Sequence, residues 1–329
     1  MIDSAHAVRQ VIGVDVGGTK VAAGFVSEHG ELSQAVRVPM NPRGTAAEGF
    51  GAVTAALDKL LANRSGDAIF ASIGVCAPGP LDPRTGVVLN PPNVPCWRDF
   101  PLVAELGRQY GVPARLDNDA NAAALAESLW GAGRGFGNVF YACVGTGIGS
   151  GIVMDGKIFH GRTGSAAEGG HVSIDYRGPA CNCGKKGCIE ALASGTAIAR
   201  RAREALGAKG EAGAALLALA GGEPAAVRSE MIGRVSETGD PLARQLMAET
   251  VEYLAVWLGN IVDLLEPDVM ILGGGVSEML RPHFHQIQTR LKDWCVNARC
   301  GEIPLVSAHY GENSGIAGGA ALCFLPDES

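Results

Sequence analysis

The sequence predicts an α/β protein with two domains. Short β-branched runs, which are typical of strands, alternate with longer apolar or Ala-rich stretches that are typical of helices. A chain of 329 residues is long enough for two domains with separate cores. Two strand–glycine tip–strand hairpins, one near the start and one near the middle, repeat the same plan. This repetition suggests two similar domains that face one ligand.

Composition indicates an acidic, globular protein. Apolar residues make up 47% of the chain, and 47 glycines predict many tight turns. A net charge of −7 argues against nucleic acid or an anionic membrane as a partner. The N-terminal residues lack the apolar core of a signal peptide, and no apolar run approaches the roughly 20 residues of a membrane helix. Nine cysteines without a regular framework favour a reduced, cytoplasmic protein.

The first hairpin carries a candidate phosphate loop. Val11–Val16 and Val21–Val26 are predicted strands, and they flank the tip Gly17-Gly18-Thr19-Lys20. The glycines let backbone N–H groups approach an anion, while the hydroxyl and the ammonium group can bind phosphate. Asp15 precedes the tip, where its carboxylate could hold magnesium directly or through water. The spacing is not that of a Walker A loop, and a Gly-Gly hairpin alone is usually only a tight turn.

A second glycine tip and a later glycine turn extend this candidate nucleotide site. Val139–Val144 is a predicted strand that leads into Gly145-Thr146-Gly147-Ile148-Gly149, and the strand resumes at Gly151. Two donor-rich tips could clasp a chain of phosphates. Further on, the strand Val269–Leu272 runs into Gly273-Gly274-Gly275-Val276 at the start of a helix. Such a corner can accommodate a nucleotide.

The remaining elements follow from periodicity and from glycine and proline breaks. Residues 45–64 are predicted to be helical, because Phe50, Val53, Leu57 and Leu60 share one face. The other predictions are strands at 69–75, 114–116 and 305–308, helices at 120–130, 251–265 and 314–324, and several helices within 195–250.

A polar cluster, Asp117-Asn118-Asp119, stands between a predicted strand and a predicted helix. One such side chain is enough to cap the helix. The excess of carboxylate and amide groups favours a catalytic base at this point.

A metal site is predicted between residues 168 and 190. His171, Cys181, Cys183 and Cys188 form a Cys₃His set, which is a standard closed set for structural zinc. The alternative is that these are ordinary buried thiols. That alternative suits the scattered cysteines elsewhere better than a polar, glycine-rich segment. The sequence therefore favours a structural zinc ion.

Two glutamates bracket this predicted metal site. A zinc-bound imidazole keeps a second nitrogen for another hydrogen bond, so His171 could contact a hydroxyl-bearing ligand. Glu168 and Glu190 could accept hydrogen bonds from the same ligand. Solvated surface charge is the usual role of glutamate, and this alternative stays open.

Taken together and in order, these motifs resemble those of the ROK family, which groups repressors, open reading frames and sugar kinases. The resemblance extends from Val11 to Phe324, and its most specific part is the cysteine segment. It rests on Asp15-Val16-Gly17-Gly18-Thr19-Lys20, Asn118-Asp119, Gly145-Thr146-Gly147-Ile148-Gly149, Glu168-x-x-His171, Cys181-x-Cys183-Gly184-x-x-Gly187-Cys188-x-Glu190 and Gly273-Gly274-Gly275-Val276.

The resemblance implies an actin-like ATPase fold of ribonuclease-H-like topology, with two α/β domains and an interdomain cleft. We expect a small N-terminal domain over residues 1–118, to which a C-terminal helix at 314–329 returns. We expect a large domain over residues 119–313, which carries the zinc-binding segment. Homodimers or homotetramers are also implied.

The resemblance further implies ATP-dependent phosphorylation of a hexose, with glucose as the first expectation. By position, Asp119 is the catalytic base. The implied sugar-binding residues are Gly79, Asn118, Asp119, Glu168, His171 and Glu190. The implied cofactors are ATP, magnesium and structural zinc. The tips Gly17–Lys20 and Gly145–Gly149 are the implied phosphate loops.

Three alternatives remain at this point. The same motifs serve kinases of N-acetylmannosamine and other hexoses or amino sugars, and Gly169, Ala167 and Cys96 depart from the family's usual residues near the expected sugar. A repressor of the family is disfavoured, because only ten residues precede Val11 and a helix-turn-helix domain needs more. A non-catalytic sugar sensor is disfavoured by the intact Asp119 and glycine tips.

Overall fold

The computed structural model describes residues 10–63, 70–208 and 212–326. These residues form two compact units. Unit 1 comprises Met1–Gly137, Gly151–Ala167 and His309–Ser329, and unit 2 comprises Asn138–Ser150 and Glu168–Ala308. The domain boundaries expected from the sequence, 1–118 and 119–313, stay a prediction.

The first five-stranded sheet begins with the predicted N-terminal hairpin. Its strand order is β3-β2-β1-β4-β7, in which the first three strands are antiparallel neighbours and β4 and β7 continue in parallel to β1. The strands are β1 (Gln10–Val16), β2 (Lys20–Ser27), β3 (Leu32–Pro39), β4 (Phe70–Ala77) and β7 (Ala114–Asn118). The predicted strands within this sheet are confirmed. β3 was not predicted, because it is an edge strand with only one buried side chain.

The second five-stranded sheet repeats this plan. Its order is β10-β9-β8-β11-β12, and β11 lies parallel to both β8 and β12. The strands are β8 (Asn138–Val144), β9 (Ile148–Met154), β10 (Lys157–Ile158), β11 (Val269–Gly273) and β12 (Leu305–Ser307). A small two-stranded sheet pairs β5 (Leu81–Asp82) with β6 (Val87–Val88). The repetition predicted from the two glycine-tipped hairpins is thus confirmed.

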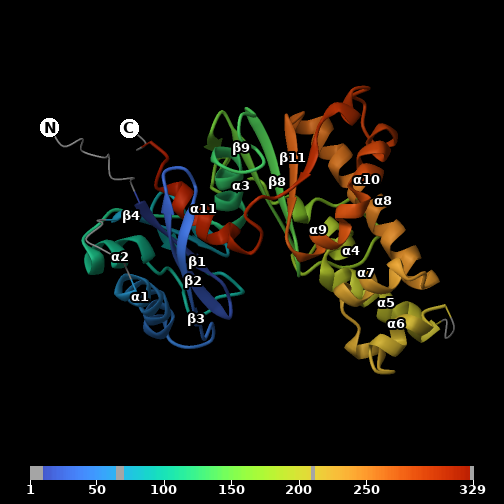
Figure 1. Ribbon diagram of the computed structural model, residues 1–329, viewed down its shortest axis with the longest axis horizontal. Helices are drawn as coiled ribbons and strands as arrows, with labels where there is room; N and C mark the ends of the chain where they lie inside the picture. The colour runs from blue at the N-terminus through green and yellow to red at the C-terminus, as the bar shows by residue number, and fades with distance from the viewer. Residues whose placement is uncertain (1–9, 64–69, 209–211, 327–329) are drawn as a thin grey trace. The chain divides into compact units, whose positions relative to one another are not determined.

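Helices cover both faces of the first sheet (Figure 1). Successive side chains of a strand point to opposite faces. Accordingly, Ile12 and Val14 pack in the core that includes α1 (Ala46–Ala62) and α2 (Leu102–Tyr110). Val11 packs on the other face, with α11 (Ser314–Leu322). The final helix therefore completes the core that begins with the first strand.

Two glycines allow α11 to lie directly on this sheet. A Cβ atom on Gly13 would lie 1.9 Å from the carbonyl oxygen of Ile316, and one on Gly74 would lie 1.8 Å from that of Gly319. Both distances are far too short for a methyl group beside a carbonyl oxygen. Both strands therefore need glycine where the helix backbone crosses them.

The helices of unit 2 are organised along α8, the long orange helix in Figure 1. It spans Pro241–Leu265 and begins before the predicted start at residue 251, because the Asp240 side chain caps it and Pro241 suits its first turn. The other helices of this unit are α4 (Ile189–Ala193), α5 (Gly195–Ala208), α6 (Ala214–Leu219), α7 (Ser229–Glu237), α9 (Gly275–Leu280) and α10 (Phe284–Arg290).

Short 3₁₀ turns complete the described chain. They are Gly169–His171, Pro224–Ala226, Arg281–His283, Leu291–Asp293, Cys300–Glu302 and Gly311–Asn313. Among the described helices, none has the length and apolar character required to cross a bilayer.

The close seat of α11 generates a stability prediction. Gly13→Ala should lower the free energy of unfolding by about 3 kcal/mol or more, because the new methyl group displaces helix backbone. The matched control is Gly51→Ala in α1, where a Cβ meets nothing within 4 Å. That change should raise stability by about 0.5–1 kcal/mol. Urea denaturation measures both, and an unchanged midpoint for Gly13→Ala would contradict the packing described.

Candidate functional site

The polar cluster at the end of β7 separates into three side chains with different environments. Asn118 is the N-cap of α3 (Asp119–Leu129), and its Oδ1 accepts the backbone N–H groups of Ala120 (2.9 Å) and Asn121 (3.4 Å). Asp119 is the first residue of the helix, and its side chain is exposed. Its Oδ1 accepts the N–H of Ala120 at 2.8 Å. Asp119 is therefore the carboxylate of this cluster that a ligand can reach.

Asp117, in contrast, is an interior residue, 3% exposed. Its Oδ1 accepts the Asn118 backbone N–H at 2.7 Å and the Asn121 amide at 3.1 Å. Its Oδ2 lies 2.6 Å from Nε2 of His160, across 43 positions of sequence. His160 is partly exposed and stands in no sequence motif, yet it contacts this buried carboxylate. No local pattern could have revealed its partner, because the two residues meet only through the fold.

The first glycine tip stands in unit 1 between β1 and β2. The Gly17 N–H donates to the Lys20 carbonyl at 2.9 Å, which closes the turn. A Cβ on Gly18 would lie 2.9 Å from the Asn93 carbonyl oxygen, so the loop after residue 90 lies directly beside this tip. Thr19 and Lys20 are exposed, so the hydroxyl and the ammonium group are available to an anion.

Burial raises the pKa of Asp15, just before this tip, while a contact from Cys76 and the charge of Lys20 act to lower it. A nearby cation would stabilise the charged form of this carboxylate.

Gly79 lies elsewhere in the same unit, where a Cβ would be 3.7 Å from the Asn118 amide nitrogen. The structure thus brings Gly79 to the polar cluster at the end of β7.

The second glycine tip stands in unit 2 between β8 and β9, and it is anchored from one side. The Gly145 carbonyl accepts the Gly195 N–H at 2.8 Å, and the Thr146 carbonyl accepts the hydroxyl of Thr196 at 2.8 Å. Gly274 adopts a φ of 90°, and a Cβ there would lie 2.5 Å from the Val144 carbonyl oxygen. The structure therefore places the Gly273–Gly275 turn beside the start of the Gly145–Gly149 tip.

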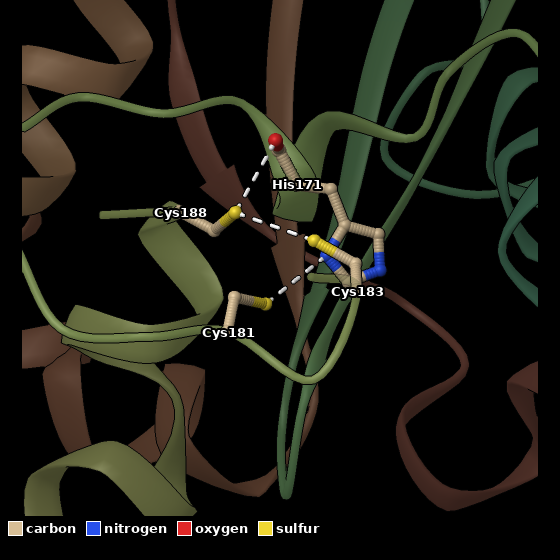
Figure 2. A group of neighbouring side chains, drawn as sticks. All are labelled: His171, Cys181, Cys183 and Cys188. Atoms are coloured by element: carbon tan, nitrogen blue, oxygen red, sulfur yellow. Dashed lines mark hydrogen bonds between the residues drawn. The ribbon is translucent and has the colours of Figure 1, made fainter. Parts of the chain in front are cut away.

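The Cys₃His set predicted from the sequence is assembled in space (Figure 2). The ligand atoms of His171, Cys181, Cys183 and Cys188 all lie within 4.8 Å of one another. Nδ1 of His171 is 3.6 Å from Sγ of Cys181, and the sulfurs of Cys183 and Cys188 are 3.6 Å apart. Zinc–sulfur bonds of about 2.3 Å in a tetrahedron place ligand atoms about 3.6–3.8 Å apart. The donor set and the spacing both fit zinc.

Electrostatics at this cluster differ between the thiols. A hydrogen bond from the Lys185 backbone lowers the pKa of the exposed Cys183. Burial raises the pKa of Cys188, which is 0% exposed. A buried thiolate is costly unless a cation compensates its charge, so the cluster has the character of a cation site.

Glu190 connects this cluster with the second glycine tip inside unit 2. Its Oε2 accepts the Ile148 N–H at 2.9 Å. Its Oε1 lies 3.9 Å from Nδ1 of His171 and 4.0 Å from Sγ of Cys181. Glu168 lies at the start of the same segment with an exposed side chain, and its carbonyl accepts the His171 N–H at 3.0 Å. Glu168 and His171 therefore flank one short 3₁₀ turn, and the Glu190 carboxylate lies beside the His171 ring, while their role in sugar binding stays a prediction.

Two sheets of the same plan, each with a glycine tip on its hairpin, place the protein in the actin-like ATPase fold class. The chain belongs to the ROK family, whose model matches residues 11–324.

Known relatives span almost the whole chain. A glucokinase from Thermotoga maritima is 34% identical over 314 residues, which cover 95% of this chain and 96% of that protein. An N-acetylmannosamine kinase from Escherichia fergusonii is 31% identical over 94% of this chain and 97% of its own length. The crystal structure of a ROK family glucokinase from Streptomyces griseus, in complex with glucose and AMPPNP, matches with a TM-score of 0.81 at 34% identity. It covers 95% of this chain and 98% of that one.

The cap at the start of α3 generates a second prediction. Asn118→Ala should lower the free energy of unfolding by about 1 kcal/mol, because two backbone N–H groups lose their acceptor. Asn118→Ser should recover most of that loss, since a serine hydroxyl caps equally well. Thermal unfolding followed by circular dichroism measures both. Equal stability of the alanine and serine variants would contradict the capping role.

Proposed function

We propose that this protein is an ATP-dependent hexose kinase that converts glucose to glucose 6-phosphate, with Asp119 as the general base. The observation that carries the proposal is the position of Asp119. It is an exposed carboxylate at the first residue of α3, next to a buried aspartate and a capping asparagine. Family membership and the kinase relatives support the reaction class.

The chemistry of phosphoryl transfer explains why an exposed carboxylate is needed. A sugar hydroxyl is a weak nucleophile, and Asp119 accepts its proton as the phosphoryl group arrives. The transferred group itself requires positioning and charge neutralisation rather than a covalent protein intermediate. Asn118, Gly79, Glu168, His171 and Glu190 bind and orient the sugar in this proposal.

The two glycine tips are the proposed phosphate-binding elements. Gly17, Gly18, Thr19 and Lys20 contribute N–H groups, a hydroxyl and a positive charge. Gly145, Thr146, Gly147 and Gly149 form the second tip, and Gly273, Gly274 and Gly275 border the nucleotide. Asp15 is the candidate magnesium ligand, because burial raises the pKa of its carboxyl group and a nearby cation would stabilise the charged form. Magnesium would neutralise charge on the phosphates.

Structural zinc is proposed for His171, Cys181, Cys183 and Cys188. The ion would hold the irregular segment that ends at α4 and would fix the imidazole that orients toward the sugar. It takes no part in phosphoryl transfer in this proposal, since the four protein ligands close its coordination.

N-acetylmannosamine is the second candidate substrate. A relative with that activity in its name is 31% identical over nearly the whole chain, close to the 34% of the glucokinase relatives. Enzymes separate such sugars strongly only where the site bonds the differing group. Glucose is preferred here because more identity is shared with the glucokinases.

The test of the reaction is ADP release with ATP and magnesium across a panel of glucose, mannose, fructose, allose, N-acetylglucosamine and N-acetylmannosamine. We expect glucose to be the best substrate by kcat/KM. Asp119→Asn should lower kcat by about 10²–10⁴-fold without a comparable change in stability. The matched control is Asp58→Asn, an exposed carboxylate of unit 1 that accepts a hydrogen bond from Tyr110 at 2.9 Å.

The outcomes separate the parts of the proposal. Turnover of no sugar would overturn the kinase assignment, and equal activity of the Asp119 and Asp58 variants would overturn the base. A marked preference for N-acetylmannosamine would keep the mechanism and replace the substrate.

The zinc proposal predicts about one zinc ion per chain in protein purified without added metal. Cys183→Ser should lose this metal and weaken sugar binding more than ATP binding, because the cluster lies beside Glu190 and His171. Cys295→Ser is the matched control, a half-buried thiol of unit 2 outside the cluster. Metal content follows from mass spectrometry, and affinities follow from calorimetry. Full activity of metal-free native protein would contradict the proposal.

A further inference from the structure

A buried serine in unit 2 holds the short turn that carries His171. Ser150 belongs to β9 and is 5% exposed. Its Oγ accepts the backbone N–H of Gly169 at 2.9 Å. Gly169 is the first residue of the 3₁₀ turn Gly169–His171, and Glu168 directly precedes it. The Ser150 hydroxyl therefore fixes the start of the turn that lies between two of the proposed sugar-binding side chains.

The first position of this turn has no room for a side chain. A Cβ on Gly169 would lie 2.4 Å from Ser150 Oγ and 3.3 Å from Cζ2 of Trp257. Trp257 belongs to α8, is 0% exposed and packs edge-to-face on Phe140 of β8, with the ring centroids 5.6 Å apart. The φ of Gly169 is not in the left-handed region. The need for glycine therefore comes from the space that Ser150 and Trp257 occupy.

Strand β9 also bounds the next residue of the turn. A Cβ on Gly170 would lie 1.8 Å from the Ile148 carbonyl oxygen, so the backbone of the turn lies directly on the strand. The N–H of Ile148 donates to Glu190 Oε2 at 2.9 Å. One short stretch of β9, residues 148–150, thus contacts both the glycines of the turn and the Glu190 carboxylate.

The hydrogen bond between Ser150 and Gly169 is buried at both ends. A buried N–H that loses its acceptor costs more free energy than the bond itself contributes. One explanation is that this bond only stabilises the core of unit 2. A purely structural bond would affect stability alone, whereas a bond that sets the turn would also affect how Glu168 and His171 meet a ligand.

We propose that Ser150 is a positioning residue for the sugar site, and that it acts through Gly169 on Glu168 and His171. This role depends on the proposed function of those two side chains. Without the Ser150 hydroxyl, the buried N–H of Gly169 loses its acceptor and the turn shifts to find another. Glu168 and His171 shift with the turn. The backbone of β9 keeps its place, so the second glycine tip and the binding of ATP are unaffected.

Kinetics and calorimetry of Ser150→Ala test this role, with glucose or with whichever sugar of the panel the native protein phosphorylates best. We expect KM and Kd for the sugar to rise about three- to tenfold, while KM for ATP stays within about twofold. The matched control is Ser236→Ala. Ser236 is another buried serine of unit 2, and its hydroxyl donates to the Gly233 carbonyl at 2.6 Å within α7. This control should leave both KM values within about twofold.

A pair of substitutions tests the contact itself. Gly169→Ala should raise KM for the sugar about tenfold or more, because the new methyl group meets the Ser150 hydroxyl at 2.4 Å. Ser150→Gly removes that hydroxyl together with its Cβ and leaves Trp257 as the nearest neighbour at 3.3 Å. The double variant Ser150→Gly/Gly169→Ala should therefore bind the sugar about threefold or more tightly than Gly169→Ala alone.

The outcomes separate the positioning role from the proposed function. The role is overturned, with the kinase assignment intact, if Ser150→Ala leaves KM for the sugar unchanged, raises KM for ATP equally, or behaves like Ser236→Ala. The contact is overturned if the double variant shows the full combined loss of the two single variants. If the native protein phosphorylates no sugar, the proposed function fails and the sugar role fails with it. Urea unfolding of the two single variants and the double variant still judges the contact, and additive losses of stability would overturn it.

Discussion

The carboxylate of Glu190 is the constraint on which the candidate site in unit 2 depends. One oxygen accepts the N–H of Ile148 at the second glycine tip, and the other lies within 4.0 Å of the Cys181 sulfur and the His171 ring. The segment before α4 contains only one 3₁₀ turn and isolated β-bridges. Because so little regular structure holds this segment, its shape depends on the cysteine–histidine cluster and on this carboxylate.

In unit 1, a buried aspartate stabilises the turn that leads into α3. Asp117 holds the N–H of Asn118, the amide of Asn121 and the ring of His160, while it is only 3% exposed. A buried carboxylate is stable only when its hydrogen bonds are satisfied. Because Asp117 must keep these hydrogen bonds, the turn before α3 is fixed, and with it the position of Asp119, the first residue of that helix. In both units an inward-facing acidic side chain supports the ligand-binding groups that we propose.

Many of the strands and the candidate metal ligands could be predicted, because the sequence patterns that indicate them are local. The strands of the two hairpins have β-branched runs and glycine tips, and the four metal-binding candidates have distinctive ligand chemistry within 18 residues of sequence. The elements that escaped prediction lack such signals. β3 is an edge strand with exposed side chains, and α2 is a short helix between Pro101 and Gly111.

The sequence by itself determined the α/β class and the cysteine–histidine set through residue type and short spacing, and its resemblance to a known family indicated the actin-like fold and the candidate base. Only the tertiary structure decided which distant groups meet. It paired His160 with Asp117, placed Gly13 under Ile316, and set the Ser150 hydroxyl against Gly169. These contacts join separate strands, turns and helices. Their partners are selected by packing and by the need to satisfy buried polar groups, neither of which leaves a local pattern in the chain.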